Sequence, residues 1–250
     1  MPVRLAGLSF FFPAYNEREN IRATVERALE VLPGLAEEFE IIVVDDGSRD
    51  GTGEIAGELA RQHSGVRVVS HPRNLGIAAA MRTGFASCTK QFIFYTDGDL
   101  QFDLAELARL IPLLGDADAV IGFRIRRQDP FRRLVIAWVY NTLIRLLFRV
   151  EFRDVDCAFK LFRREVFDRT PISALGSNGA VFFPELLISL ASAGGRIRQV
   201  GVTHYPRRAG QPKGALPHVI LGAVGDLLAL RVRLWRGRGG ARRSRQTGGG

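Results

Sequence analysis

The feature that most constrains the fold is an alternation of short apolar runs with longer segments of helical periodicity in the first half of the chain. The short runs have the β-branched and aromatic content of strands, and the longer runs repeat apolar residues every three or four positions. The expected strands are 8–12, 39–44, 66–70, 92–96 and 119–122, and the expected helices are 17–32, 50–62, 75–87 and 104–114. This alternation predicts βαβ units, and therefore an α/β fold with a mostly parallel sheet flanked by helices.

The chain carries a large excess of positive charge. Its 250 residues include 35 Lys and Arg against 26 Asp and Glu, a formal net charge of +9. A basic chain favours phosphorylated ligands, an anionic membrane or nucleic acid. Part of the excess lies in the Gly-, Arg- and Ser-rich stretch 237–250, which we expect to be a disordered basic tail.

The cysteine content and the N-terminal residues indicate the cellular compartment in which the protein is expected. The 2 cysteines are too few for a disulfide framework and lack metal-ligand spacing, so a reducing, cytoplasmic compartment is expected. Residues 1–7 show no signal-peptide pattern, and no run reaches the roughly 20 apolar residues that a spanning helix needs.

Two apolar runs in the second half are interrupted by arginines, over 130–150 and 216–236. One interpretation makes them core helices. The other makes them amphipathic helices at a bilayer interface, with arginines at headgroup level, so that 216–236 would be a C-terminal interfacial amphipathic helix.

Acidic side chains follow two of the expected strands. Asp45 and Asp46 follow the second strand, and Asp97 and Asp99 follow the fourth. Ligands of open parallel sheets bind beyond the carboxyl ends of the strands, so we expect these carboxylates to line one cleft. Helix capping is the alternative for Asp46 and Asp50, and a solvated turn is the alternative for 97–99.

Two like charges separated by one glycine are costly unless a cation lies between them. Oxygen ligands alone suit Mg²⁺ or Mn²⁺, which often bridges substrate phosphates. Gln101 would add a neutral oxygen, and Gly98 would let the backbone approach the ligand. The chain has neither a dinucleotide-binding GxGxxG after its first strand nor a P-loop, so a nucleotide-diphosphate donor with a metal-stabilised leaving group remains.

Several motifs in this order resemble the family 2 glycosyltransferases of inverting type, which have the GT-A (Rossmann-like) fold, and especially the dolichol- and polyprenyl-phosphate sugar synthases. The motifs are 13–21, 43–52, 74–76, 97–101, 122–124, 154–164 and 182–185. The resemblance covers about residues 8–215 and implies a GT-A domain over 1–215. Two positions depart from it, Ala137 where a hydroxyl is common and Ile77 where a basic residue often follows the Asn-x-Gly motif.

The resemblance also implies roles for individual residues on the donor side. The positions that would hold the nucleotide sugar are Pro13, Tyr15, Glu17, Val44, Asp46, Asp97, Gly98, Asp99, Arg207 and Lys213. The metal would be held by Asp97, Asp99 and Gln101. In the basic loop, Arg207 and Lys213 would neutralise the leaving diphosphate.

On the acceptor side, Arg124 and Arg133 match positions that bind the lipid phosphate, which suits guanidinium groups. A solvated or headgroup charge is the alternative for both. The catalytic set would be Asp97, Asp99, Arg124 and Asp156.

Other acids keep two interpretations each. Asp154 and Asp156 could orient the acceptor or the sugar, or pair with Lys160 or Arg163. Glu185 could contact the sugar or cap a helix. The 4 histidines are scattered and are assigned to the surface or to packing, because a polyprenyl phosphate is already an oxyanion and needs no strong base.

The resemblance therefore implies metal-dependent, inverting transfer of a hexose from a UDP- or GDP-sugar to a polyprenyl phosphate. The expected partners are the donor, the lipid acceptor and an anionic membrane surface, and not nucleic acid; whether a membrane-protein partner is needed stays open. The protein would act peripherally at the cytoplasmic face of the membrane, or else in the cytoplasm. One alternative is a family 2 enzyme with a soluble or polysaccharide acceptor, and another is a basic scaffold with an inactive site.

Overall fold

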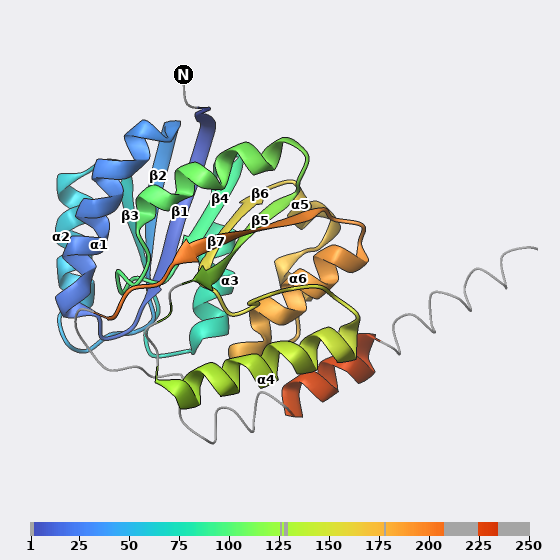
Figure 1. Cartoon of the computed structure of the whole chain (residues 1–250). Helices are drawn as coiled ribbons and strands as arrows, with labels where there is room; N and C mark the ends of the chain where they lie inside the picture. The colour runs from blue at the N-terminus through green and yellow to red at the C-terminus, as the bar shows by residue number, and fades with distance from the viewer. Residues whose placement is uncertain (1–2, 126, 128–129, 178, 208–224, 235–250) are drawn as a thin grey trace, which may run out of the picture.

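The computed structural model describes residues 3–125, 127, 130–177, 179–207 and 225–234, and it contains a seven-stranded sheet (Figure 1). The strand order is β3-β2-β1-β4-β6-β5-β7. The strands are β1 (Leu5–Ala14), β2 (Ala36–Asp45), β3 (Val66–Ser70), β4 (Phe92–Thr96), β5 (Ala119–Ile125), β6 (Phe159–Arg163) and β7 (Ile197–Thr203). This confirms the expected α/β class.

Most neighbouring strands pair in parallel. β1 pairs in parallel with β2 and with β4, β2 pairs in parallel with β3, and β5 pairs in parallel with β7. β6 runs antiparallel to both β4 and β5. The carboxyl ends of β1, β2 and β4 therefore lie at one edge of the sheet, with β1 in the middle.

Helices cover both faces of the sheet (Figure 1). α1 (Arg18–Val31) and α2 (Thr52–Gln62) lie on one face, and α3 (Ile77–Ser87) and α6 (Phe182–Ser192) lie on the other. Aromatic side chains alternate between the faces along β1: Phe10 stacks on Phe94 at 5.3 Å between ring centroids, whereas Phe11 meets Phe85 of α3 at 4.8 Å. All four rings are buried, so they join the sheet to its helical layers.

Local elements differ from the expected ones at three places. The expected helix 104–114 is two 3₁₀ segments, η2 (Leu104–Arg109) and η3 (Ile111–Gly115), because Pro112 has no N–H with which to continue an α-helix. A further 3₁₀ turn, η1 (Leu32–Gly34), follows α1. β1 also continues through Pro13 to Ala14.

The second half adds α4 (Phe131–Phe148), α5 (Val166–Arg169) and the 3₁₀ turns η4 (Ile172–Ala174) and η5 (Gly179–Val181). Residues 225–234 are helical and lie beside α4 (Figure 1). Leu227 and Leu230 are fully buried there, so this face of the helix belongs to the core. The rest of the expected segment 216–236 and the tail 237–250 lie outside the described residues. Among the helices that the structure describes, none has both the length and the apolar character needed to cross a membrane.

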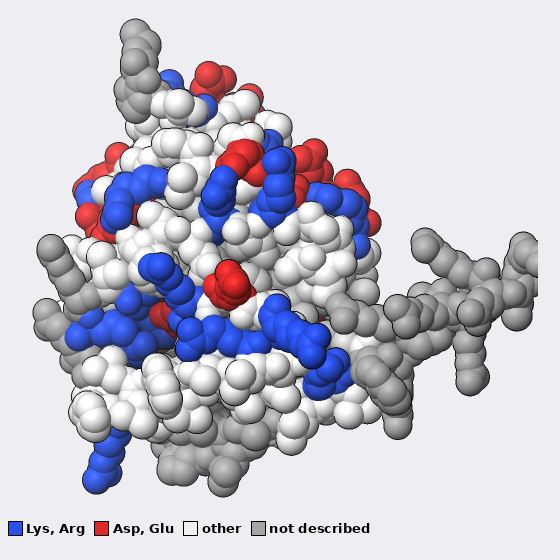
Figure 2. Space-filling model, turned by 45° about the vertical axis from the view of Figure 1, so that its right-hand side comes forward, with Lys and Arg blue, Asp and Glu red and all other residues white. Residues whose placement is uncertain are grey.

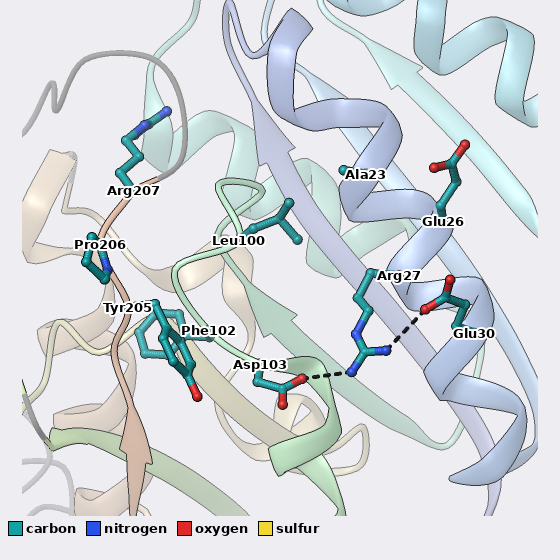
Figure 3. A pocket seen from close by; sticks show the side chains of 10 residues that line it. All are labelled: Ala23, Glu26, Arg27, Glu30, Leu100, Phe102, Asp103, Tyr205, Pro206 and Arg207. Carbon is teal, nitrogen blue, oxygen red and sulfur yellow. Dashed lines mark hydrogen bonds and ion pairs between the residues drawn. The ribbon is translucent and has the colours of Figure 1, made fainter.

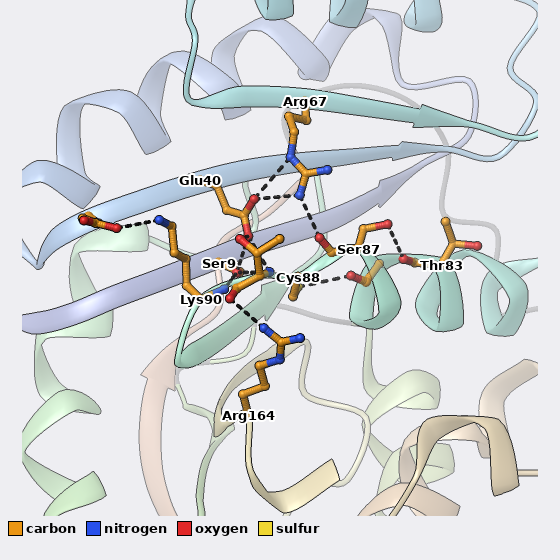
Figure 4. Close-up of polar contacts among 11 residues, drawn as sticks. Ser9, Glu40, Arg67, Thr83, Ser87, Cys88, Lys90 and Arg164 are labelled. Atoms are coloured by element: carbon orange, nitrogen blue, oxygen red, sulfur yellow. Dashed lines mark hydrogen bonds and ion pairs between the residues drawn. The ribbon is translucent and has the colours of Figure 1, made fainter. Parts of the chain in front are cut away.

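The buried carboxylate of Glu40 joins strands β1, β2 and β3 (Figure 4). It lies away from the carboxyl ends of the strands, where Asp46 and Asp97 follow β2 and β4. Oε1 of Glu40 accepts hydrogen bonds from Ser9 Oγ at 2.6 Å and from the backbone N–H of Thr89 at 2.7 Å. Its Oε2 accepts from Arg67 Nη2 at 2.7 Å. Burial alone would raise the pKa of Glu40, but these hydrogen bonds outweigh it and lower the pKa to about 2. The network therefore stabilises β1, β2 and β3 together.

Candidate functional site

The loops after β1 and β2 are tied to each other at the carboxyl edge of the sheet. The backbone N–H of Asn16 donates to Ser48 Oγ at 2.9 Å, and that of Glu17 donates to Thr52 Oγ1 at 2.9 Å. Asn16 has a φ of +51°, an uncommon value for a residue other than glycine. These bonds give the site a fixed wall at the N-termini of α1 and α2.

Asp46 is buried at the end of β2 and is held from the next βα loop. Its Oδ1 accepts from the backbone N–H of Leu75 at 2.9 Å and lies 2.7 Å from His71 Nδ1. Its Oδ2 accepts from the N–H of Gly76 at 2.9 Å. The other ring nitrogen of His71 lies 2.9 Å from Thr83 Oγ1 on α3.

Asp46 therefore binds the loop that precedes α3 and does not cap α2. The N-cap of α2 is Gly51, and Asp50 before it accepts the N–H of Thr52, the first residue of the helix, at 3.0 Å. His71 is a site residue that sequence reasoning assigned to the surface or to packing. The available signal was its position directly after β3, at the same edge as the acids.

Gly47 allows the Asp46 loop to pack against this neighbouring loop. It has a φ of +71°, and a Cβ at this position would lie 2.3 Å from the carbonyl carbon of Arg73. A side chain at position 47 would therefore push the 73–76 backbone away from Asp46.

The loop after β4 carries the two closely spaced acids. Tyr95 Oη donates to Asp97 Oδ1 at 2.7 Å, and the backbone N–H of Gln101 donates to Asp99 Oδ1 at 3.2 Å. Leu100, between Asp99 and Gln101, has a φ of +57°. Burial raises the pKa of Asp97, and burial together with the charge of Asp97 raises the pKa of Asp99 to about 7. A cation would relieve this repulsion.

Arg207 supplies one positive charge to this loop. Its Nη1 lies 3.5 Å from Asp99 Oδ2, and its Nη2 forms an ion pair with Glu17. The segment before Arg207 is bound to the acidic loop by two hydrogen bonds. Gln101 Nε2 donates to the carbonyl of Tyr205 at 3.0 Å, and the N–H of Tyr205 donates to the carbonyl of Gln101 at 2.8 Å. The structure thus brings Glu17, Asp99, Gln101 and Arg207 together. Lys213 lies outside the described residues.

A pocket of about 790 Å³ adjoins the acidic loop (Figure 3). Leu100 and Arg207 line it on the side of the site, and Tyr205 lines it from the segment after β7. On the side of α1, Arg27 forms ion pairs with Glu30 and Asp103, each at 3.1 Å.

The acidic loop fits a hard divalent ion by its chemistry. Within the described residues, no group of three or more His, Cys, Asp or Glu side chains could hold a metal. Mg²⁺ and Mn²⁺ do not need such a cage, because one or two carboxylates and substrate phosphate oxygens suffice. Asp97 and Asp99 provide those carboxylates.

Packing also requires a glycine at position 98. A Cβ at position 98 would lie 2.6 Å from the ring of Phe12, so packing of the loop on the core requires the glycine. Val44 is also a core residue, with its side chain fully buried, whereas Pro13 and Tyr15 are partly exposed at the end of β1. Asp46 and Asp97 share one edge of the sheet, with β1 between their strands.

Arg124, at the end of β5, forms a bidentate ion pair with Asp154. Its Nε lies 2.7 Å from Oδ2, and its Nη2 lies 2.8 Å from Oδ1. Both side chains are largely buried. Asp154 therefore pairs with Arg124 and not with Lys160 or Arg163, while Arg133 is half-buried in the first turn of α4.

Asp156 has a different environment from Asp154. Asp156 is exposed, whereas Asp154 is buried. Desolvation and the charge of Asp154 raise the pKa of Asp156 to about 6. Lys160 is buried, with Nζ bonded to the carbonyl of Cys157 and 4.2 Å from the centre of the Phe183 ring.

Glu185 is buried and binds protein groups. It accepts from the backbone N–H of Ser177 at 2.7 Å and from that of Gly176 at 3.2 Å. Arg233 of the helix 225–234 donates to its Oε1 at 2.8 Å. Its described partners thus hold a loop and the C-terminal helix in place.

The sequence matches known glycosyltransferases. The model of glycosyl transferase family 2 matches residues 9–170. The chain is 30% identical over 239 residues to dodecaprenyl-phosphate galacturonate synthase of Rhizobium johnstonii, covering 93% of this chain and 70% of that protein. It is 34% identical over 211 residues to polyprenol monophosphomannose synthase of Mycolicibacterium smegmatis, covering 80% and 78%. It is 34% identical over 229 residues to glycosyltransferase AglD of Haloferax volcanii, but spans only 36% of the length of AglD.

Solved structures share the fold. Glucosyl-3-phosphoglycerate synthase from Mycobacterium tuberculosis, in complex with Mn²⁺ and UDP-glucose, aligns with a TM-score of 0.68 at 24% identity, over 90% of this chain and 79% of that chain. Mannosyltransferase PcManGT from Pyrobaculum calidifontis, in complex with GDP-Man and Mn²⁺, aligns with a TM-score of 0.60 at 21% identity, over 83% and 59%. These likenesses, together with the sheet order, show a GT-A-like fold.

Proposed function

The chain belongs to glycosyl transferase family 2 and is a glycosyltransferase, and from this premise we propose that it moves a hexose from a UDP- or GDP-sugar to a polyprenyl phosphate. The transfer would invert the anomeric centre and depend on Mg²⁺ or Mn²⁺. It would take place at the cytoplasmic face of a membrane, with the protein bound peripherally. The observation that carries the proposal is the acidic loop after β4, closed by Arg207 at the edge where Asp46 is also held.

Two kinds of relative support the choice of substrates. Curated relatives of this chain are named for sugar transfer to dodecaprenyl phosphate and to polyprenol phosphate. Structures with the same fold contain Mn²⁺ with UDP-glucose or with GDP-Man. The two nucleotides differ, so the proposal covers both.

The donor side of the proposal assigns roles to residues of the acidic loop and of the loops around it. Asp46 would accept an N–H of the base, with Pro13, Tyr15 and Glu17 beside the nucleoside. A Mg²⁺ or Mn²⁺ ion held by Asp97 and Asp99, with Gln101 next to them, would neutralise charge that develops on the leaving diphosphate. Arg207 and Lys213 would bind the same diphosphate as fixed positive charges.

The acceptor side would use cations near β5 and α4. Arg124 is oriented by Asp154 and would bind the lipid phosphate together with Arg133. Asp156 would orient the reacting groups from the wall of the cleft. The phosphate oxygen is a nucleophile without losing a proton, so no base is required for its attack on the sugar C1.

Membrane contact would be made by α4 and the helix 225–234. Large apolar side chains are exposed on both helices, and they are Phe131, Val135, Ile136, Trp138, Val139, Leu146, Leu228 and Val232. Figure 2 shows Lys and Arg side chains in a band. The face below this band is largely uncharged, and it lies at the height where Figure 1 places α4. An apolar face bordered by cations suits the surface of an anionic bilayer.

The test is transfer of labelled sugar from UDP- and GDP-sugars in vesicles that contain polyprenyl phosphate. The proposal predicts a product that is soluble in organic solvent and labile to mild acid. Label that enters only water-soluble or polymeric material would overturn the lipid acceptor. It would support the alternative of a soluble or polysaccharide acceptor.

A further inference from the structure

We propose that His71, anchored by Thr83, is a positioning residue that orients Asp46 toward the nucleobase of the donor. The inference rests on the proposed function, because it assigns Asp46 to the base. It adds two side chains that do not touch the donor but determine how the base-binding carboxylate is oriented.

The hydrogen bonds of Asp46 leave room at one oxygen. Oδ1 accepts from Leu75 N–H and faces His71 Nδ1, so the two acceptor positions of a carboxylate oxygen are filled. Among the described residues, Oδ2 accepts only from Gly76 N–H, at 2.9 Å. Oδ2 therefore keeps one acceptor position for an N–H group of a ligand.

The His71 ring is fixed at both nitrogens. An ionised Asp46 only accepts hydrogen bonds, so Nδ1 carries the hydrogen between the two side chains, while Nε2 lies within hydrogen-bond distance of the Thr83 hydroxyl. The backbone of His71 is fixed as well, since its N–H donates to the carbonyl of Asp45 at 2.8 Å. The ring is therefore held in place by Thr83 of α3, and it in turn holds the Asp46 carboxylate in one orientation.

The two backbone donors cannot fix Asp46 in the same way. Leu75 and Gly76 lie on an exposed loop ahead of α3, where Leu75 and Ile77 are exposed. His71 and Asp46, by contrast, have side chains only 9% and 5% exposed. A charge-assisted hydrogen bond in such a place is stronger than one between neutral groups.

The chemistry of Oδ2 also defines the class of base. A carboxylate oxygen pairs with an imide or amide N–H, as on the pairing edge of uracil or guanine. At the same position, cytosine N3 and adenine N1 carry no hydrogen, so their lone pair would face a lone pair of Oδ2, and only their exocyclic amino groups could donate. With His71 fixing the direction of Oδ2, discrimination between these bases would depend on His71 as well as on Asp46.

The test compares wild-type protein with His71→Phe, His71→Asn and Thr83→Val in the presence of Mn²⁺. Calorimetry measures the binding of UDP, GDP and ribose 5-diphosphate, which lacks a base. For whichever nucleotide binds the wild type, His71→Phe should weaken binding by about tenfold, the loss expected for one buried charge-assisted hydrogen bond. Thr83→Val should weaken it by roughly threefold, and His71→Asn, which can still donate to Asp46, should restore most of the affinity.

Binding of ribose 5-diphosphate should be equal in all four proteins, and in steady-state assays the donor KM should rise while kcat stays unchanged. Equal nucleotide affinity in wild type, His71→Phe and Thr83→Val would overturn this inference alone, as would an equal loss for ribose 5-diphosphate. If His71→Phe does not fold, Thr83→Val and His71→Asn decide by the same criteria. A wild type that binds neither UDP nor GDP would overturn the proposed function, and this inference with it.

Discussion

The guanidinium of Arg207 lies 3.5 Å from Oδ2 of Asp99, and it connects the segment after β7 to the acidic loop after β4. Arg207 also pairs with Glu17 at the start of α1, so one cation joins three parts of the site. In the proposed reaction, the positive charge of Arg207 would bind the leaving diphosphate.

Replacing Arg207 should therefore reduce catalysis more than folding. Arg207→Gln is expected to lower kcat/KM for the donor by about 100-fold, because it removes a fixed charge from the site where negative charge develops. Arg27→Gln, in the neighbouring pocket, is the matched control and should leave kcat/KM near that of the wild type. An Arg207→Gln enzyme with wild-type kinetics would show that the ion pair with Asp99 has only a structural role.

Substitutions of the neighbouring acids Asp154 and Asp156 should have different effects: loss of Asp154 should lower stability, and loss of Asp156 should lower activity. Asp154→Asn leaves the buried guanidinium of Arg124 without its carboxylate, and should lower the free energy of unfolding by about 3 kcal/mol. Asp156 reaches solvent, so Asp156→Asn should unfold at a urea concentration close to that of the wild type. Its transfer rate should nevertheless fall by about tenfold or more, because it orients reacting groups. Equal loss of stability in the two variants would contradict this assignment.

The Glu40 network should make stability depend on acid pH. The pKa of Glu40 falls from its ordinary value of 4.5 to about 2 on folding, so its contribution is complete above pH 4.5 and is lost as the pH falls toward 2. That loss is on the order of 3 kcal/mol in the free energy of unfolding. Urea unfolding of wild type and Glu40→Gln between these pH values measures it, and the two curves should converge at low pH. The control is Glu37→Gln, which replaces an exposed acid on the same strand and should leave the pH dependence unchanged.

Vesicle binding should depend on the exposed apolar residues of α4. Trp138 and Leu146 are 65% and 74% exposed, and replacing both with Glu should lower partitioning onto vesicles of phosphatidylglycerol by about tenfold or more. Val3→Glu is the control, since Val3 is 64% exposed near the N-terminus, at the opposite end of the molecule in Figure 1. Flotation of all three proteins measures the difference. Equal recovery of the three with the vesicles would exclude α4 as the contact.

Local patterns were sufficient for the first half of the fold. The runs 66–70 and 92–96 are β3 and β4 with the expected bounds, because apolar strands that end in polar residues are visible in a short window. β6 and β7 were not predicted. β6 is reversed in the sheet, and its direction depends on where α4 and the loop after it return the chain, which no local pattern records.

The acids were predicted more completely than their partners. Asp97 and Asp99 could be identified because they follow a buried strand. The contacts of Asp46 with His71 and of Arg124 with Asp154 join residues 25 and 30 positions apart, so they depend on the packing of separate loops. Gly98 illustrates the same limit, since its contact with the ring of Phe12 joins the loop to β1, which a local pattern does not record.

The central claim is that Asp97 and Asp99 hold a divalent ion against the donor diphosphate. Calorimetric titration of UDP- and GDP-sugars into the protein, with Mn²⁺ and then with EDTA, tests it most directly. The account predicts saturable binding that requires the ion and is weakened by about 100-fold or more in Asp99→Asn, but not in Asp103→Asn, which replaces the N-cap of η2. Donor binding of equal affinity in EDTA, or in Asp99→Asn, would contradict it.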